Sequence, residues 1–129
     1  MLVYDRRRAD PRFDAGLPCL TDIDFLLKLF ARNETVFHLG EPLHTYIKQP
    51  QSVSNKPGAG AAMIATKRLL RQRLSDGFYP LAVPDGREGL LRFYEISLAA
   101  EQSYGARLEE NPGLLFEDHL EPMLIAAGT

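Results

Sequence analysis

Two carboxylates separated by a single residue are the strongest candidates for chemistry in this sequence. Asp22 and Asp24 lie in the stretch FDAGLPCLTDIDFLLK, residues 13–28. Apolar residues follow at the i, i+3, i+4 and i+7 positions of a helix, and these are Ile23, Leu26, Leu27 and Phe30. The spacing predicts an amphipathic helix from residue 22 to about residue 32, with both acids in its first turn.

Helix initiation alone explains both acids without any activity. In this interpretation the Thr21 hydroxyl caps the helix by accepting a hydrogen bond from the backbone N–H of Asp24. The Asp24 carboxylate reaches back to the Thr21 N–H as a shortened capping box, and Leu20 and Phe25 form a hydrophobic staple. A negative charge in the first turn also stabilises a helix by about 0.3–1 kcal/mol through the macrodipole.

A second interpretation divides the two acids between structure and chemistry. Asp24 caps the helix, whereas Asp22, at the first helical position, points outward to meet a substrate hydroxyl. The helix fixes such a carboxylate in place and its dipole keeps the carboxylate ionised, as a general base requires. The residues by themselves leave both interpretations open.

The elements that must position these acids divide the chain into an N-terminal part with strands and a helix, and a helical C-terminal part. Short strands are expected at residues 2–4, 35–39 and 42–47, where β-branched and aromatic residues gather, and residues 48–60 are a loop by composition. Helices are expected at about 61–75, closed by Asp76-Gly77, and at about 87–108. An apolar piece at 114–127 reads as one more helix, interrupted near Pro122. The fold class expected is therefore α/β or α+β, with residues 1–57 as one part and residues 58–129 as a helical C-terminal region.

Composition excludes several classes of protein. The chain has 129 residues, a hydrophobic fraction of 45% and a formal net charge of −2, which gives no general attraction to nucleic acid. Cys19 is the only cysteine, so an internal disulfide is excluded. No apolar run approaches the roughly 20 residues that span a bilayer, and the charges of MLVYDRRR follow its apolar patch, the wrong order for a signal peptide. A soluble, cytoplasmic protein is expected.

Three short motifs occur in an order that resembles a known family. They are Phe13-Asp14-Ala15, then Thr21-Asp22-Ile23-Asp24-Phe25-Leu26-Leu27-Lys28, then Pro42-Leu43-His44-Thr45-Tyr46 with Ser52-Val53-Ser54. This order resembles the acceptor-side half of a family 2-type glycosyltransferase with the GT-A fold, over roughly residues 2–56. The resemblance implies a hexosyltransferase-type enzyme of polysaccharide biosynthesis. Such an enzyme transfers a sugar from a nucleotide-sugar, with inversion, to a saccharide or lipid-linked acceptor.

The resemblance also implies roles for individual residues. It places the general base on Asp22, which would deprotonate the acceptor hydroxyl. Lys28 stands where the family commonly has an arginine, and Gln49 stands where it has a histidine. The residues expected at the substrate are Asp24, Lys28, Tyr46, Lys48, Gln49, Ser52 and Ser54.

The nucleotide-binding half of this family is not recognisable in the sequence. That half is a βαβ unit carrying an Asp-x-Asp motif for a divalent metal, Mg or Mn in a full-length enzyme, and it would precede residue 1. Asp22-Ile23-Asp24 has the pattern but occupies the wrong place in the family order, so no metal ligand is assigned in this chain. The expectation is a C-terminal portion that is inactive alone.

Two other functions compete with sugar transfer. One is a non-catalytic binding or dimerisation module, in which both acids only initiate the helix and the helical back half forms a homo-oligomer. The other is a nucleic-acid binder that uses residues 6–8 and the basic residues at 67–73, although these basic residues are more simply a solvated face. His38, His44 and His119 lack the spacing of metal ligands.

Overall fold

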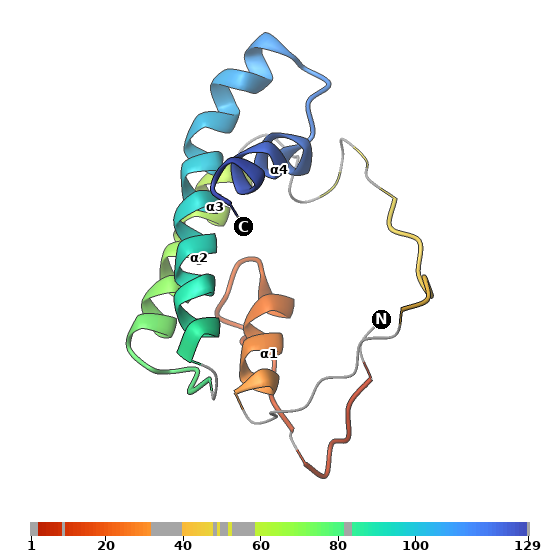
Figure 1. Ribbon diagram of the computed structural model, residues 1–129, viewed down its shortest axis with the longest axis vertical. Helices are drawn as coiled ribbons and strands as arrows, with labels where there is room; N and C mark the ends of the chain where they lie inside the picture. The colour runs from red at the N-terminus through yellow and green to blue at the C-terminus, as the bar shows by residue number, and fades with distance from the viewer. Residues whose placement is uncertain are drawn as a thin grey trace.

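Four α-helices make up the regular structure of the described residues. The computed structural model describes residues 3–8, 10–31, 40–47, 49, 52, 59–81 and 84–128. The helices are α1 (Thr21–Phe30), α2 (Ala59–Ser75), α3 (Pro84–Glu110) and α4 (Phe116–Ala126). α2 and α3 form an antiparallel hairpin, α4 folds back and packs across α3, and α1 lies beside the end of the hairpin that carries the α2–α3 turn (Figure 1).

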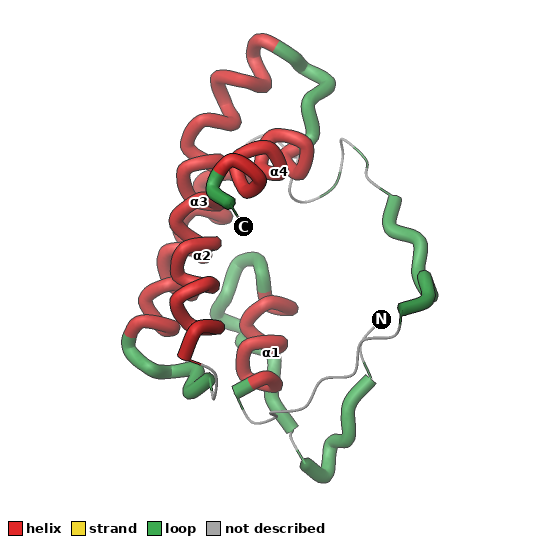
Figure 2. The backbone as a smooth tube through the Cα atoms, viewed as in Figure 1, coloured by secondary structure: helices red, strands yellow, loops and turns green. Residues whose placement is uncertain are grey.

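The expected α/β class is wrong for the part of the chain that the structure describes, since this part contains no strand (Figure 2). Residues 42–47, expected as a strand, have no regular secondary structure, and neither do residues 3 and 4 of the expected first strand. Residues 35–39 lie outside the described residues. The physical reason is that strand propensity reports how well a residue fits a sheet, and an extended segment becomes a strand only beside a partner strand.

The helix predictions were right in type and close in extent. Of the four expected helix starts, those of α2 and α3 lie two and three residues after the observed ones, and α4 continues through Pro122 without a break. Tyr94 and Tyr104 of α3 are buried, whereas Phe93 is 38% exposed. None of the described helices combines the length and the apolar character that crossing a membrane requires.

The start of α1 differs from the predicted cap. Thr21 is the first helical residue, and the cap position belongs to Leu20, whose backbone is left-handed (φ 54°) and which offers no side-chain hydrogen bond. The N–H of Asp24 donates to the Leu20 carbonyl at 3.1 Å rather than to a hydroxyl. Leu20 packs against the main apolar cluster, whereas Phe25 belongs to a second one. Tertiary packing therefore sets this helix start, at the cost of an uncommon backbone conformation.

The C-terminus of α2 is closed as predicted at Gly77. This residue has φ 76°, a left-handed conformation in which glycine carries no steric penalty. The Phe78 N–H donates to the Arg73 carbonyl at 2.9 Å and the Gly77 N–H to the Leu74 carbonyl at 3.3 Å, which is a Schellman motif. This turn brings Phe78 and Tyr79 back beside Arg73.

The main core joins the front of the chain to the helical hairpin. Its buried members come from the segment before α1, from α1, from α2, from the α2–α3 turn and from α3, and they are Leu17, Leu27, Leu70, Leu74, Tyr79 and Tyr94. A separate cluster of Ala100, Tyr104 and Phe116 packs α4 on α3. The expected boundary between residues 57 and 58 is thus crossed by one continuous apolar core.

A buried ion pair connects α2 with α3 below α4. Lys67 Nζ lies 2.6 Å from Glu101 Oε1, both side chains are at most 7% exposed, and the ammonium lies 4.5 Å from the centroid of the Phe116 ring. The interpretation of residues 67–73 as a solvated basic face is therefore wrong for Lys67. Arg73 also pairs with carboxylates inside the fold. Neither Lys67 nor Arg73 is therefore available to bind a nucleic-acid phosphate, which weakens the nucleic-acid hypothesis.

We expect Thr21→Ala to change the free energy of unfolding by less than about 0.5 kcal/mol, because Thr21 is a helical residue and not a cap. Urea unfolding followed by circular dichroism measures the change. A loss of about 1 kcal/mol or more would mean that the hydroxyl does cap α1.

We expect Lys67→Met alone to destabilise the fold by about 3–5 kcal/mol, because it leaves the Glu101 carboxylate buried without its cation. Lys67→Met combined with Glu101→Leu should recover most of that loss, since an apolar pair carries no desolvation penalty. A double-mutant cycle measured by urea unfolding tests this. Independent, additive effects of the two changes would contradict the assignment of a coupled buried pair.

Candidate functional site

Asp24 is the most deeply buried acid of the described residues and is surrounded by donors. Its side chain is 0% exposed. Oδ1 accepts hydrogen bonds from Arg73 Nη1 at 3.0 Å and from the Tyr79 hydroxyl, and Oδ2 lies 2.5 Å from Lys28 Nζ. A buried carboxylate without such partners would be strongly unfavourable, so these three contacts make the position of Asp24 possible.

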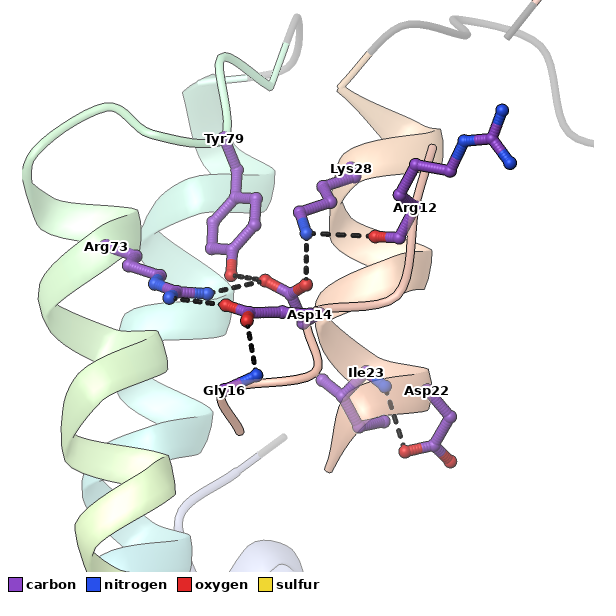
Figure 3. A network of polar contacts seen from close by, with 9 residues as sticks. Arg12, Asp14, Gly16, Asp22, Ile23, Lys28, Arg73 and Tyr79 are labelled. Carbon is purple, nitrogen blue, oxygen red and sulfur yellow. Dashed lines mark hydrogen bonds and ion pairs between the residues drawn. The ribbon is translucent and has the colours of Figure 1, made fainter. Parts of the chain in front are cut away.

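Asp14 extends the same network to the segment before α1 (Figure 3). Its Oδ2 lies 2.7 Å from Arg73 Nη2, and its Oδ1 accepts from the Gly16 N–H at 2.9 Å. The Arg73 guanidinium therefore bridges two carboxylates that precede it in the chain by 59 and 49 positions. Lys28 Nζ also donates to the Arg12 carbonyl at 3.0 Å. The buried cluster is defined here as the enclosed Asp24 and Tyr79 with the half-buried Asp14, Lys28 and Arg73, and it ties α1 to the end of α2.

The pKa values of the cluster follow from these contacts. The hydrogen bond from Arg73 lowers the pKa of Asp14 below its ordinary 3.8, and the same bond raises the pKa of Arg73. Burial, and then the hydrogen bond to Asp24, raises the pKa of Tyr79, so its hydroxyl remains a donor at neutral pH. Burial also raises the pKa of Tyr94 to about 12, with a smaller contribution from the Asp24 charge.

Asp22 has a different environment from Asp24. It is exposed on the first turn of α1, and its Oδ1 accepts a hydrogen bond from the Ile23 N–H at 3.0 Å. Its side chain points away from Asp14, Arg73 and Tyr79 (Figure 3). The structure thus separates the two acids, with Asp24 inside the cluster and Asp22 at the surface.

The other residues expected at the substrate are dispersed. Lys28 is engaged in the buried cluster. Tyr46, 66% exposed, belongs to a segment that runs well apart from α1 (Figure 1). Gln49 is exposed and its carbonyl accepts from the N–H of Ser52, which is half-buried. Lys48 and Ser54 lie outside the described residues. The described residues show no contact of Asp22 with Tyr46 or Ser52.

Asp22-Ile23-Asp24 does not fit a divalent metal ion. Asp24 is surrounded by two cations, while Asp22 points elsewhere, so their carboxylates do not converge. In the described part of the chain no group of three His, Cys, Asp or Glu side chains has the geometry of a metal site. His44 is exposed, His119 Nε2 lies 2.8 Å from Ser103 Oγ, and His38 is not among the described residues.

A hollow of about 470 Å³ opens beside the buried cluster. It is lined by residues 10–12, by Lys28 of α1, by Ala31 directly after α1, and by Phe78 and Pro80 between α2 and α3. Of the residues expected at the substrate, Lys28 lines this hollow, whereas Asp22, Tyr46 and Ser52 do not.

Sequence reasoning missed Arg73 and Tyr79. No local pattern marks them, because their partners lie 49 or more positions away. One signal in the sequence pointed to Asp14, a partner of Arg73. The Asp-x-Gly of residues 14–16 is typical of an Asx turn, in which the aspartate bonds the backbone two residues on, and this fixes the Asp14 carboxylate.

Comparison with protein-family models, with curated proteins and with solved structures finds no match for this chain. A function for this chain therefore has to be inferred from the order of its motifs and from the geometry of its side chains.

The lowered pKa of Asp14 predicts an acid-sensitive fold. Because the pKa is lower in the folded than in the unfolded chain, its stabilising contribution is complete above about pH 4 and disappears as the pH falls through the folded value. We expect Asp14→Asn to be less stable than the wild type at pH 7, and the difference to shrink towards pH 2. Urea unfolding at a series of pH values measures both.

An equal effect of Asp14→Asn at pH 7 and at pH 2 would contradict this prediction, since the loss would then be one of shape rather than charge. Asp85→Asn is the matched control. Asp85 is an exposed acid in the first turn of α3, and its replacement should change the free energy of unfolding at pH 7 by less than Asp14→Asn does.

Proposed function

We propose that this chain is the acceptor-side portion of a nucleotide-sugar-dependent, inverting glycosyltransferase of the family 2 type, with Asp22 as the general base. The observation that carries the proposal is the unequal environment of the two acids. Asp24 is enclosed by Lys28, Arg73 and Tyr79, which leaves Asp22 as the exposed carboxylate of the motif. The order of three family-like motifs gives this acid its chemical context.

In this reaction the protein has to accept one proton. The Asp22 carboxylate takes the proton of an acceptor hydroxyl, and the oxygen attacks the anomeric carbon of the donor sugar. The bond from that carbon to the nucleotide diphosphate breaks, the diphosphate leaves with the electron pair, and the configuration inverts. A general base contributes about 10²–10⁴-fold when it is held within hydrogen-bond reach of the proton.

The buried cluster supports this role because it makes α1 a rigid base for Asp22. Arg73 and Tyr79 hold the helix from α2 and the following turn. A catalytic carboxylate on a helix that is fixed by buried contacts is positioned more accurately than one on a loop.

Donor binding belongs to the nucleotide-binding half in enzymes of this type. We therefore expect no turnover by the chain alone, and we place the reaction in the cytoplasm, where nucleotide-sugars are made. The divalent ion that neutralises the leaving diphosphate would be held by that half, since Asp22 and Asp24 do not fit a metal ion.

The test is a protein in which the chain is joined to a GT-A nucleotide-binding half carrying an Asp-x-Asp motif. Release of nucleotide diphosphate is measured for a panel of UDP-, GDP- and dTDP-sugars with saccharide acceptors. We expect Asp22→Asn to lower kcat by about 10²–10⁴-fold, because the amide keeps the shape and removes the base. The free energy of unfolding should change by less than about 0.5 kcal/mol, because Asp22 is exposed.

Asp85→Asn provides the control, since it removes an exposed acid from the first turn of another helix. It should leave activity unchanged and lower the free energy of unfolding by at most about 1 kcal/mol, through the helix dipole. If Asp22→Asn kept full activity in an active fusion protein, Asp22 would not be the general base.

A helical binding module is the second candidate. Leu69 of α2, Phe93 of α3 and Ile125 of α4 are 42%, 38% and 68% exposed, which gives the helices apolar surface for another copy of the chain. Sedimentation equilibrium distinguishes the candidates. A stable oligomer that dissociates in Phe93→Lys, together with absence of transfer in every fusion, would favour the module.

A further inference from the structure

α1 carries a second apolar cluster, separate from the core that it shares with the hairpin. Phe25 and Leu29 are buried in this cluster, and Tyr4 packs against them. The Phe13 ring stacks on the Phe25 ring with 4.5 Å between centroids, and the Tyr4 ring meets Phe25 edge-on at 5.6 Å. The N-terminal segment, defined here as residues 3–13, therefore supplies the cover of this cluster.

The outer side of this cover is open to solvent. Phe13 is 63% exposed and Val3 is 81% exposed. Residues 3–8 and 40–47 both lie on the side of α1 that faces away from α2 and α3 (Figure 1). Among the described residues, five of the nine large apolar side chains with high exposure come from these two parts of the chain, namely Val3, Phe13, Leu43, Tyr46 and Ile47. Single exposed apolar residues are normal, but their concentration on one side of a molecule indicates an interaction surface.

Exposed arginines accompany these apolar side chains. Three arginines of the N-terminal segment, with side chains 67%, 90% and 77% exposed, share two aspartates, and the pairs are Arg6–Asp10, Arg7–Asp5 and Arg12–Asp10. Arg8 is exposed and pairs with no carboxylate of the described residues. The Arg12 guanidinium points away from the buried cluster (Figure 3). With four arginines and two aspartates, residues 3–13 have a net charge of +2, although the whole chain has −2.

We propose that the N-terminal segment, together with the exposed side chains of residues 43–47, binds the surface of a membrane that contains anionic lipid. The arginines contact the headgroup phosphates, to which they are complementary in charge. Val3 and Phe13 enter the interfacial layer, where apolar and aromatic side chains are removed from water. The proposal is independent of sugar transfer, because the chain alone is sufficient to test it.

The exposed side chains favour a lipid surface over a nucleic acid or a protein. Proteins that bind single-stranded nucleic acid stack bases on aromatic rings, and aliphatic side chains such as Val3 and Ile47 have no ring to offer. A protein partner has to match the shape of the surface that it covers. Residues 3–8 and 40–47 contain no helix or strand, and a fluid lipid surface adapts to such an irregular outline.

The probes are sucrose-loaded vesicles of phosphatidylcholine alone or of an equimolar mixture with phosphatidylglycerol, sedimented with the full chain. We expect the partition coefficient to be at least about tenfold higher for the mixture, because each arginine near an anionic surface contributes about fivefold. Raising the salt concentration from about 0.1 M to about 1 M shortens the Debye length from about 10 Å to about 3 Å, and should remove most of this preference.

A pair of arginine substitutions tests the charged half of the surface. Arg7→Gln combined with Arg8→Gln should lower the partition coefficient for the mixed vesicles about tenfold or more. The matched control is Arg68→Gln combined with Arg107→Gln, which removes the same charge from α2 and α3. Each pair contains one arginine bound to a nearby carboxylate and one exposed arginine outside any ion pair of the described residues. The control should change partition by less than about twofold.

A single substitution tests the apolar half. Val3→Ser should lower the partition coefficient about three- to tenfold, because a hydroxymethyl group gains little from leaving water. Val3 is 81% exposed, so the circular dichroism spectrum and the urea midpoint should not change. Ile125→Ser is the control, since it removes a β-branched side chain that is 68% exposed on α4, and it should leave partition unchanged.

Four results would overturn the proposal. The first is equal binding to the two vesicle compositions, and the second is an equal loss in the Arg7/Arg8 variant and in its control. Unchanged partition of Val3→Ser would exclude insertion of the apolar side chains. Tighter binding to duplex DNA than to the mixed vesicles, at the same phosphate concentration, would identify a nucleic acid as the partner of this surface.

Discussion

The arrangement of α1 depends on Asp24, whose carboxylate is completely excluded from solvent. An ionised acid in the interior is tolerated only when charged and hydrogen-bonding partners replace water. Lys28 comes from the same helix, but Arg73 and Tyr79 come from the far end of α2 and the turn after it. The helix therefore has one favourable position against the hairpin, and a rotation about its axis would leave charges unpaired on both sides.

The consequences of this constraint reach the surface on both ends of α1. At its start, Leu20 adopts a left-handed backbone, Thr21 is helical, and Asp22 is turned to solvent. At its end, Lys28 and Ala31 form part of the hollow. The same anchored Arg73 that satisfies Asp24 also supports the Phe78 ring. Two surface features with different chemistry thus derive their geometry from one buried cluster.

A second buried pair has a comparable role further along the hairpin. Lys67 and Glu101 join α2 to α3, with the Phe116 ring of α4 above the ammonium. Such pairs contribute less to stability than an equally well-packed apolar contact, but mispairing them is costly. The hairpin and α4 are in this way fixed in register by charge as well as by the apolar clusters around Tyr94 and Tyr104.

Local pattern by itself determined the helices of this protein and one of their ends. Periodic apolar residues predicted α1, α2 and α3, and the Asp76-Gly77 pair predicted the end of α2, because both depend on neighbours within a few positions. The same reasoning failed for the strand at residues 42–47, since a strand needs a partner, and for the Thr21 cap, since Leu20, which packs on the main apolar cluster, occupies the cap position. Only the tertiary structure decided which acid is enclosed and which is exposed, because the cations and the hydroxyl that satisfy Asp24 include groups 49 and 55 positions away, beyond the reach of any local pattern.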